Sequence, residues 1–279
     1  MQIPNVDRSL QILETLAAVP DGLPLGELAR RVEVPKSAAH RLLQALASRG
    51  YVHQDPVTQN YAMSLKVAVL GFTFLQARHL PDVAQEALDR LARQSGEYCR
   101  LAVLEGENLV WVARAQGATQ GLRYDPPMGG AVVLHATATG KAWLATLPED
   151  EALRIVCARG FSTPAGFGKH AVKNVDELRA QLRDTRRRGY GLAVEEGEPG
   201  TVAIAVVFRA HAGADAPVAG TVSIAGPLTR LPDARVRELV PLLRAAADEI
   251  SQLWPLQKRQ RDAAPAAAAR TPENVESAS

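Results

Sequence analysis

Apolar residues near the start of the chain recur every three or four positions, which is the spacing of amphipathic helices. This pattern predicts helices over residues 6–19 and about 25–32, and a third helix that begins at Pro35 and ends before Gly50. Proline suits the first position of a helix because its missing N–H would be unpaired there, and glycine readily adopts the left-handed conformation that ends one. Residues 33–35 form a connection of the length that a helix-turn-helix needs.

The third predicted helix has one apolar and one polar side. We expect its apolar stripe to be buried; it consists of Ala39, Leu42, Leu43, Leu46 and Ala47. The other side carries groups of the kind that contact phosphates or base edges, namely Lys36, Ser37, His40, Arg41 and Gln44. An ordinary solvated surface is the alternative interpretation of this polar side.

Two short extended segments, 51–54 and 60–63, follow the third helix and flank the turn signal Asp55-Pro56. Helix, tight turn, helix and two-stranded ribbon in this order are typical of a winged helix-turn-helix. The sequence therefore predicts a DNA-binding domain over residues 1–62, with the polar side of the third helix suited to the major groove.

Residues 63–79 are predicted to form a linker helix that is apolar on too many sides to stand alone. Its apolar residues are Val67, Val69, Leu70, Phe72, Phe74 and Leu75. Such a helix needs a second partner surface, because an amphipathic surface helix has only one apolar stripe. Burial between two subunits is the favoured interpretation, and burial against its own domain is the alternative.

Residues 80–255 are predicted to form a second domain of mixed helices and strands. We expect helices at 81–95, 139–146, 149–158, 175–188 and 232–254, strands at 99–104, 109–113, 191–194, 202–208 and 218–224, and further extended segments at 121–124 and 131–134. Hairpin-like links between strands favour an α+β domain with one largely antiparallel sheet. Residues 256–279 are rich in alanine, proline and charge, and we expect a disordered tail there.

Composition narrows the class of protein. A formal charge of +2 over 279 residues excludes indiscriminate binding of polyanions, so any DNA affinity must come from a local surface. Cys99 and Cys157 lie far apart and indicate no disulfide framework, which favours a reducing compartment. The first residues lack the pattern of a signal peptide, and no apolar run has the length of a membrane span, so we expect a cytoplasmic protein.

The sequence gives little evidence for catalysis. His135, Thr137 and Thr139 lie close in sequence, but there is no Gly-x-Ser-x-Gly elbow and no evident acidic partner for the histidine. The carboxylates at 195, 196 and 198 precede Pro199-Gly200 and are expected to cap a loop. The six histidines and two cysteines lack metal-ligand spacing, so we expect no enzyme, metal or cofactor.

Several longer strings identify a family resemblance. They are VDRSLQILE, GLPLGELARRVEVPKSAAHRLLQALASRGYV and YAMSLKVAVLG in the first domain, and LHATATGKAWLA, RRRGYGLAVEEGEPGTVAIAVVF and TVSIAGP in the second. In this order and spacing the chain resembles the IclR family of bacterial transcriptional regulators, over about residues 5–255. The resemblance implies a GAF-like effector-binding domain behind the winged helix, and a homodimer or dimer of dimers.

The resemblance also implies which residues contact DNA. The surface that reads DNA is the start of the third helix, with Lys36, Ser37, Ala38, His40 and Arg41. Four further residues resemble those with which the family contacts the DNA backbone, namely Arg8, His53, Gln54 and Gln59. Ala38 stands where the family frequently has a hydroxyl residue. A methyl contact to thymine is compatible with alanine there, but one hydrogen bond is lost.

The effector pocket that the resemblance implies lies around residues 135–140 and the strands near 193, 203, 223 and 225. Its expected members are Met128, Leu134, His135, Ala138, Thr139, Gly140, Ala193, Ala203, Ser223 and Ala225. Family members that hold a small carboxylate often have polar residues at three positions where this chain has alanine. We therefore expect an acid with an aromatic or bulky apolar body, because apolar lining with few polar groups favours one.

We expect the carboxylate of this acid to be received by Ser223, Thr139 and the backbone N–H groups near Gly140. Arg100 and Arg123 fall on extended segments and are further candidates to meet an anion, but the sequence does not fix which face they take. The alternative is a pocket filled by bulky neighbours such as Met128, Tyr124 or Leu134.

These features together predict a regulator that binds operator DNA, with repression commoner than activation, and that responds to a small organic acid from a catabolic pathway. The alternative is a metabolite-binding sensor or enzyme whose N-terminal domain only dimerises. Substitutions on the polar side of the third helix distinguish the two, because only the regulator would lose DNA binding.

Overall fold

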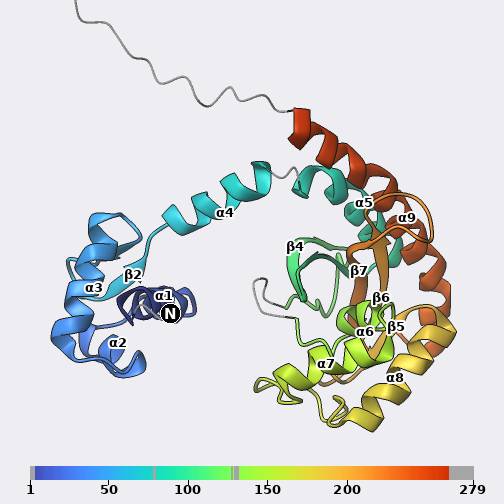
Figure 1. Ribbon diagram of the computed structural model, residues 1–279, viewed down its shortest axis with the longest axis horizontal. Coiled ribbons are helices and arrows are strands. Elements are labelled where there is room, and N and C mark those ends of the chain that lie inside the picture. The colour runs from blue at the N-terminus through green and yellow to red at the C-terminus, as the bar shows by residue number, and fades with distance from the viewer. Residues whose placement is uncertain (1–3, 78–79, 127, 129–131, 264–279) are drawn as a thin grey trace, which may run out of the picture. The chain divides into compact units, whose positions relative to one another are not determined.

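The computed structural model describes residues 4–77, 80–126, 128 and 132–263. The chain divides into two compact units, Met1–Ala77 and Arg78–Ser279 (Figure 1). Each unit has its own hydrophobic core.

The first unit has the predicted order of elements. It consists of α1 (Pro4–Ala17), α2 (Leu25–Arg31), α3 (Lys36–Ser48), β1 (Val52–Gln54), β2 (Tyr61–Met63) and α4 (Lys66–Ala77). Ile12 of α1, Leu28 of α2 and Leu43 of α3 meet in its core and are fully buried. Antiparallel pairing of β1 with β2 forms the wing.

The predicted apolar stripe of α3 is wrong at one residue, Ala47. Ala39 and Leu43 are buried and Leu46 is partly buried, but Ala47 is exposed. A four-residue step turns a helix by about 40° more than one full turn. Ala47 has therefore rotated off the stripe that Ala39 and Leu43 present to the core.

Local turns place α3 and the wing. Glu33 takes a positive φ of 53° in the turn before α3, and Gly50 takes a φ of 73° just after it, in agreement with its predicted role as a left-handed stop. In the wing loop, Asp55 Oδ1 accepts hydrogen bonds from the N–H groups of Val57 and Thr58, at 2.8 and 2.7 Å. Hydrogen bonds from the Thr58 and Val57 backbone lower the pKa of Asp55.

The second unit is an α+β domain, as predicted. Its elements are α5 (Leu80–Ser95), β3 (Tyr98–Glu105), β4 (Asn108–Gln116), α6 (Ala138–Leu144), α7 (Glu149–Arg159), α8 (Val175–Arg188), β5 (Gly191–Val194), β6 (Thr201–Arg209), β7 (Val218–Pro227) and α9 (Asp233–Ala263). Residues 121–124 and 132–134, expected to be extended, form no strand in the structure, and residue 131 lies outside the described residues.

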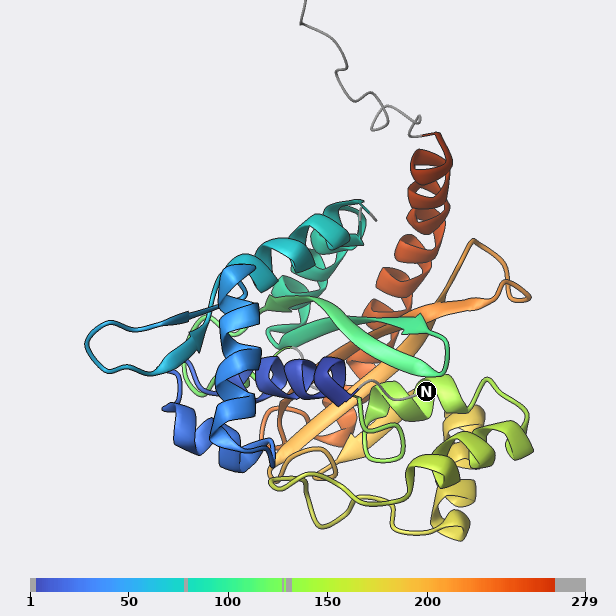
Figure 2. The same cartoon turned by 60° about the vertical axis from the view of Figure 1, so that its left-hand side comes forward.

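The long helix α9 differs from its expected end at residue 254. It continues to Ala263 and runs past the edge of the sheet (Figure 2), so residues 256–263 of the expected disordered tail are helical. Seven of the eight residues there are leucine, glutamine, lysine, arginine or alanine, which are strong helix formers, and the composition of the whole tail hid this propensity. The remaining tail residues, 264–279, lie outside the described residues.

Five antiparallel strands form the sheet of the second unit, in the order β4-β3-β7-β6-β5. Helices α5 and α9 cover one face, and α6 covers the other, with α8 packed against α6 and α7 against α8 (Figure 1). The core of the unit therefore lies mainly between the sheet and the α5–α9 pair.

Helix α6 packs closely on the sheet through small residues. Ala138 and Ala142 of α6 pack on Ala193 and Ala205 of the sheet in one buried cluster. A Cβ on Gly191 would lie only 2.1 Å from the Ala138 carbonyl oxygen, so only glycine fits at the start of β5. Small residues on both surfaces thus remove most of the space between α6 and the strands.

Candidate functional site

The polar side of α3 forms one continuous surface in the first unit. Lys36, Ser37, Arg41 and Gln44 are exposed, and His40 is partly buried. The structure therefore brings the predicted DNA-contacting residues of this helix together on one side, where cationic and hydrogen-bonding groups alternate.

Of the four residues predicted to contact the DNA backbone, Arg8, Gln54 and Gln59 already have hydrogen-bond partners within the first unit. Arg8 donates from one terminal nitrogen to Gln11 Oε1 at 2.8 Å and to the Val32 carbonyl at 3.0 Å, which ties α1 to the end of α2. Gln54 Nε2 donates to the Gln59 carbonyl at 3.0 Å. These contacts stiffen the wing and the helix pair, whereas His53 on β1 is exposed.

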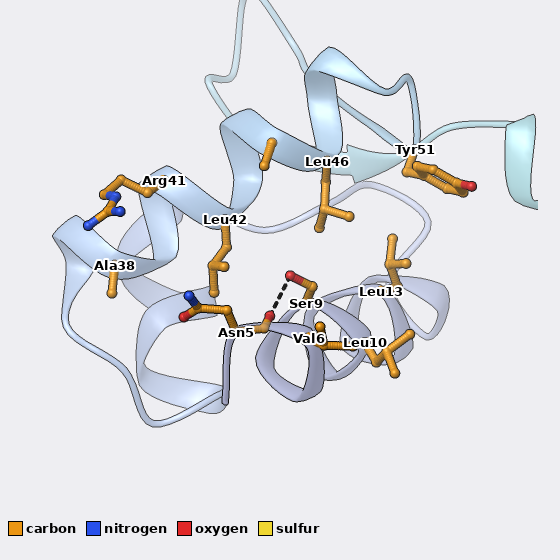
Figure 3. A pocket seen from close by; sticks show the side chains of 11 residues that line it. Asn5, Val6, Ser9, Leu10, Leu13, Ala38, Arg41, Leu42, Leu46 and Tyr51 are labelled. Atoms are coloured by element: carbon orange, nitrogen blue, oxygen red, sulfur yellow. Dashed lines mark hydrogen bonds between the residues drawn. The ribbon is translucent and has the colours of Figure 1, made fainter. Parts of the chain in front are cut away.

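An apolar groove of about 650 Å³ separates α1 from α3 (Figure 3). Val6, Leu10 and Leu42 are among its lining residues. Ala38 and Arg41 lie together at one end of the groove (Figure 3). Ala38 is partly buried and borders this groove, so its methyl group lies between the polar side of α3 and helix α1.

Helix α4 exposes large apolar side chains. Val69 is 58% exposed, Leu70 48% and Phe72 67%. The predicted excess of apolar surface is thus present, and the chain itself leaves these three side chains in contact with solvent. Several large exposed apolar residues on one helix are typical of a helix that contacts a partner.

In the second unit, the predicted pocket residues that belong to strands lie in two rows on the α6 face of the sheet. Register pairing aligns Tyr98, Ala225, Ala203 and Ala193 in the first row. The next row holds Arg100, Ser223, Ala205 and Gly191. The three alanines noted in the sequence are therefore direct cross-strand neighbours.

A small inner cavity of about 40 Å³ lies between these rows and α6. Five predicted pocket residues line it, namely Ala138, Thr139, Ala193, Ala203 and Ser223. This volume is close to that of a single water molecule, about 30 Å³. The small alanine side chains therefore allow α6 to approach the sheet and do not leave room for a ligand. Arg100, which the sequence offered as a candidate to meet an anion, and Tyr124, which it offered as a pocket-filling neighbour, also line the cavity. The lining residues that the prediction missed are Trp111, Ala136, Thr137, Gly197 and Thr201.

The other predicted pocket residues are not among those that line the cavity. Leu134 is buried in the core under α6 and α7, and the His135 ring packs on Phe161 with a centroid distance of 5.3 Å. Gly140 is pressed against the Leu134 backbone, 2.2 Å from a would-be Cβ, and Met128 accepts a 3.8 Å hydrogen bond from the Tyr98 hydroxyl. Ala225 shares the row of alanines without lining the cavity.

The start of α6 is less available to an anion than the sequence suggested. The N–H of Gly140 donates to Thr137 Oγ1 at 3.1 Å, and the Thr137 hydroxyl donates to the Val133 carbonyl at 2.9 Å. Thr137 thus caps its own helix and occupies the Gly140 N–H that was expected to receive a carboxylate.

The main positive charge beside the cavity is Arg100. Its guanidinium carbon lies 3.8 Å from the centroid of the Trp111 ring and 5.5 Å from that of Tyr98. Arg100 Nε is buried and, among the described residues, has no hydrogen-bond partner. Burial lowers the pKa of Arg100, since it disfavours the charged form.

A larger outer cavity of about 380 Å³ adjoins the same arginine. Its walls include Trp111, Tyr124, Val133 and Phe167, and Glu198 lies at it too. Burial raises the pKa of Tyr124 to about 12.

Tyr124 is held in place through its backbone neighbours. Gln116 Nε2 donates to the Tyr124 carbonyl at 2.8 Å, and Arg230 donates to the Leu122 carbonyl at 2.6 Å. Arg230 is itself fixed by two bonds to the buried carboxylate of Glu97, at 2.6 and 2.7 Å. The segment that carries Tyr124 is thereby anchored to β4 and to the turn after β7.

The described part of the chain lacks two kinds of feature. It contains no group of three or more histidine, cysteine, aspartate or glutamate residues arranged to hold a metal ion. None of its helices is both long enough and apolar enough to cross a membrane.

Comparison with known proteins gives two family matches. Residues 5–56 match the model of the IclR helix-turn-helix domain, and residues 72–252 match that of the bacterial transcriptional regulator IclR C-terminal domain. The Transcriptional repressor IclR of Escherichia coli (strain K12) is 30% identical over 253 residues, which cover 90% of this chain and 89% of that protein.

Solved structures share the fold. The crystal structure of Thermotoga maritima IclR superposes with a TM-score of 0.69 at 24% identity, covering 90% of this chain and 98% of that one. An IclR homologue from Microbacterium hydrocarbonoxydans, solved with 4-hydroxybenzoate, gives a TM-score of 0.72 at 23% identity, covering 90% and 99%.

Proposed function

The chain belongs to the IclR family of bacterial transcriptional regulators, and from this premise we propose that it is a repressor whose operator binding is controlled by a small organic acid with an aromatic or bulky apolar body. It is a transcriptional regulator and not an enzyme, as are the relatives that it matches. The observation that carries the proposal is the exposed polar side of α3 within a winged helix-turn-helix.

The first step of this function is contact with operator DNA. Lys36, Ser37 and Arg41 at the start of α3 would enter the major groove, with His40 and Gln44 beside them. His53 on the wing would contact the sugar-phosphate backbone of the DNA. Arg8, Gln54 and Gln59 would position the helices and wing through the intramolecular hydrogen bonds described above and take a smaller part in DNA contact.

The second step is self-association. Val69, Leu70 and Phe72 on α4 expose apolar surface that a second copy of the same helix would bury. A dimer would present two winged helices to half-sites about one helical turn apart. It would also raise the affinity of a chain whose net charge is only +2.

The third step is control by an effector bound in the second unit. The cavities on the α6 face of the sheet combine aromatic and aliphatic walls with one partly buried cation, Arg100, which favours an organic acid with an apolar body. The neighbour solved with 4-hydroxybenzoate supports this choice, because a protein of the same fold forms a complex with an aromatic acid. The effector would change DNA affinity by binding one arrangement of the dimer better than the other.

The DNA-binding proposal is tested by selecting sites from a randomised DNA pool and footprinting the selected sequence. We expect Lys36→Glu to abolish the footprint, because it reverses a charge at the start of α3. The matched control is Arg183→Glu, an equal charge reversal at an exposed position of α8 in the second unit, which should keep the footprint. An unchanged footprint with Lys36→Glu would instead favour a sensor whose N-terminal unit only dimerises.

The effector class is tested by calorimetry with benzoate, 4-hydroxybenzoate, phenylacetate, pyruvate and glyoxylate. We expect the aromatic acids to bind and to change the affinity for the selected DNA. Tight binding of pyruvate or glyoxylate without binding of any aromatic acid would contradict the proposal.

A further inference from the structure

The inner and outer cavities of the second unit share a wall. Arg100, Trp111, Tyr124, Thr137 and Gly197 line both of them. The Arg100 guanidinium, stacked on Trp111, therefore lies at the boundary between a space of about 40 Å³ and one of about 380 Å³.

The charge of Arg100 is not balanced within this wall. Lys141, a buried cation of the same unit, is paired with Glu196 at 2.6 Å, but the partly buried Arg100 has no ion pair with any residue that the structure describes. The acid closest to its environment is Glu198, which is exposed beside the outer cavity. A partly buried cation whose Nε is buried without a hydrogen-bond partner is unfavourable, and an anion that binds beside it would offset this cost.

The volumes of the inner and outer cavities determine where the apolar body of such an anion can lie. An apolar cavity that accepts benzene measures about 150 Å³, so the inner space is too small for an aromatic ring. The outer space is large enough, and Trp111, Val133 and Phe167 give it apolar walls.

We propose that Arg100 receives the carboxylate of the effector and that the apolar body of the effector lies in the outer cavity against Trp111 and Phe167, instead of over the row of alanines. This inference rests on the proposed function. It names the ligand class as an aromatic monocarboxylate. A planar guanidinium binds a carboxylate through two parallel hydrogen bonds, so the Arg100 side chain suits this role.

Glu198 sets a further limit on the ligand. A second carboxylate on the far side of the body would approach a like charge, whereas a hydroxyl group there would meet an acceptor. The arrangement thus favours a monocarboxylate with a neutral or hydrogen-bond-donating substituent over a dicarboxylate.

The test uses the full chain and its Arg100→Met variant, with benzoate, 4-hydroxybenzoate, benzamide and terephthalate as probes in calorimetry. We expect benzoate and 4-hydroxybenzoate to bind the unchanged chain, and Arg100→Met to weaken both at least tenfold. Benzamide and terephthalate should bind at least tenfold more weakly than benzoate to the unchanged chain. Arg183→Met, which removes an exposed arginine of the same unit, is the matched control and should bind benzoate normally.

Two controls distinguish lost binding from misfolding of Arg100→Met. They are thermal unfolding of that variant and the conservative substitution Arg100→Lys. Lysine keeps the charge but not the paired donors, so it should bind benzoate with an intermediate affinity. Benzoate binding by Arg100→Met within twofold of the unchanged chain would overturn the inference, and so would the absence of aromatic acid binding in a chain that still binds its selected DNA. Loss of DNA binding by the unchanged chain would instead overturn the proposed function itself.

Discussion

Lys141 Nζ of α6 lies 2.6 Å from Glu196 Oε1, and the two side chains are 0% and 7% exposed. Gln181 Oε1 of α8 lies 3.4 Å from the same ammonium group. Burial lowers the pKa of Lys141, while the neighbouring Glu196 acts against this shift. The pair joins α6 to the loop between β5 and β6, immediately before Gly197, which lines both cavities.

Lys141→Met should destabilise the protein strongly, because it leaves the Glu196 carboxylate buried and unpaired. Removal of one partner from a buried ion pair typically costs about 3–5 kcal/mol in the free energy of unfolding. The double variant Lys141→Met with Glu196→Leu should recover much of this loss, because it removes both charges. Urea unfolding of the two single variants and the double variant measures the coupling.

The matched control is the exposed pair Arg187–Asp184 on α8, where the nitrogen–oxygen distance is 2.8 Å. Asp184→Asn should change the free energy of unfolding by no more than about 0.5 kcal/mol. A small effect of Lys141→Met, equal to that of Asp184→Asn, would show that water or a counter-ion reaches Glu196.

The sequence pattern was sufficient to predict the limits of some helices and strands, but not to predict which side of the sheet each side chain occupies. It predicted the limits of α8 and β5 as the structure has them, because clear start and stop signals bound them. Arg100 was recognised as a candidate, but its face was undetermined. That face follows from pairing opposite Ser223, a long-range register that one strand does not encode.

Trp111 was missed for a related reason. Leu101 pairs with Ala113 and Ala102 pairs with Trp111, so Val112 is an extra residue in β4. This bulge turns Trp111 to the α6 face of the sheet, opposite to the face that simple alternation from Ala113 would give it. The volume of the inner cavity was equally hidden, since it depends on how closely α6 approaches Ala193.

Arg41→Ala should weaken binding to the selected DNA and make it less dependent on salt. Each phosphate contact contributes about 0.9 to the slope of log K against log salt concentration, so loss of one contact should reduce the slope by about one. Fluorescence anisotropy titrations at several salt concentrations give this slope. Arg187→Ala, at an exposed position of α8, should leave it unchanged, and an unaltered slope with Arg41→Ala would place this side chain away from the phosphates.

Phe72→Asp should shift the protein from dimer towards monomer. Phe72 is 67% exposed on α4, and a carboxylate there would be buried without a partner in a dimer that uses this helix. Sedimentation equilibrium should show at least a tenfold weaker dimer. Val57→Asp in the wing is the control, because Val57 is 88% exposed but lies outside α4. Equal dimerisation of all three proteins would assign the interface to another surface.

His135 is a buried histidine outside the cavities. Its ring packs on Phe161, and its Nε2 is buried and has no hydrogen-bond partner among the described residues. Burial lowers its pKa below the ordinary value of 6.5, and a hydrogen bond with the Phe161 backbone acts in the opposite direction. The folded chain therefore resists protonation of a group that the unfolded chain protonates freely.

This difference predicts a loss of stability in acid. As the pH falls below about 6.5, the unfolded chain binds a proton at His135 before the folded chain does, so the free energy of unfolding decreases until the pH reaches the lower pKa of the folded state. One proton gives a slope of at most about 1.4 kcal/mol per pH unit. Urea unfolding from pH 7.5 to 5 should show His135→Gln losing this part of the decline, while His211→Gln, at an exposed position, keeps it. Identical acid profiles for the two variants would mean that His135 is protonated as readily in the folded chain as in the unfolded one.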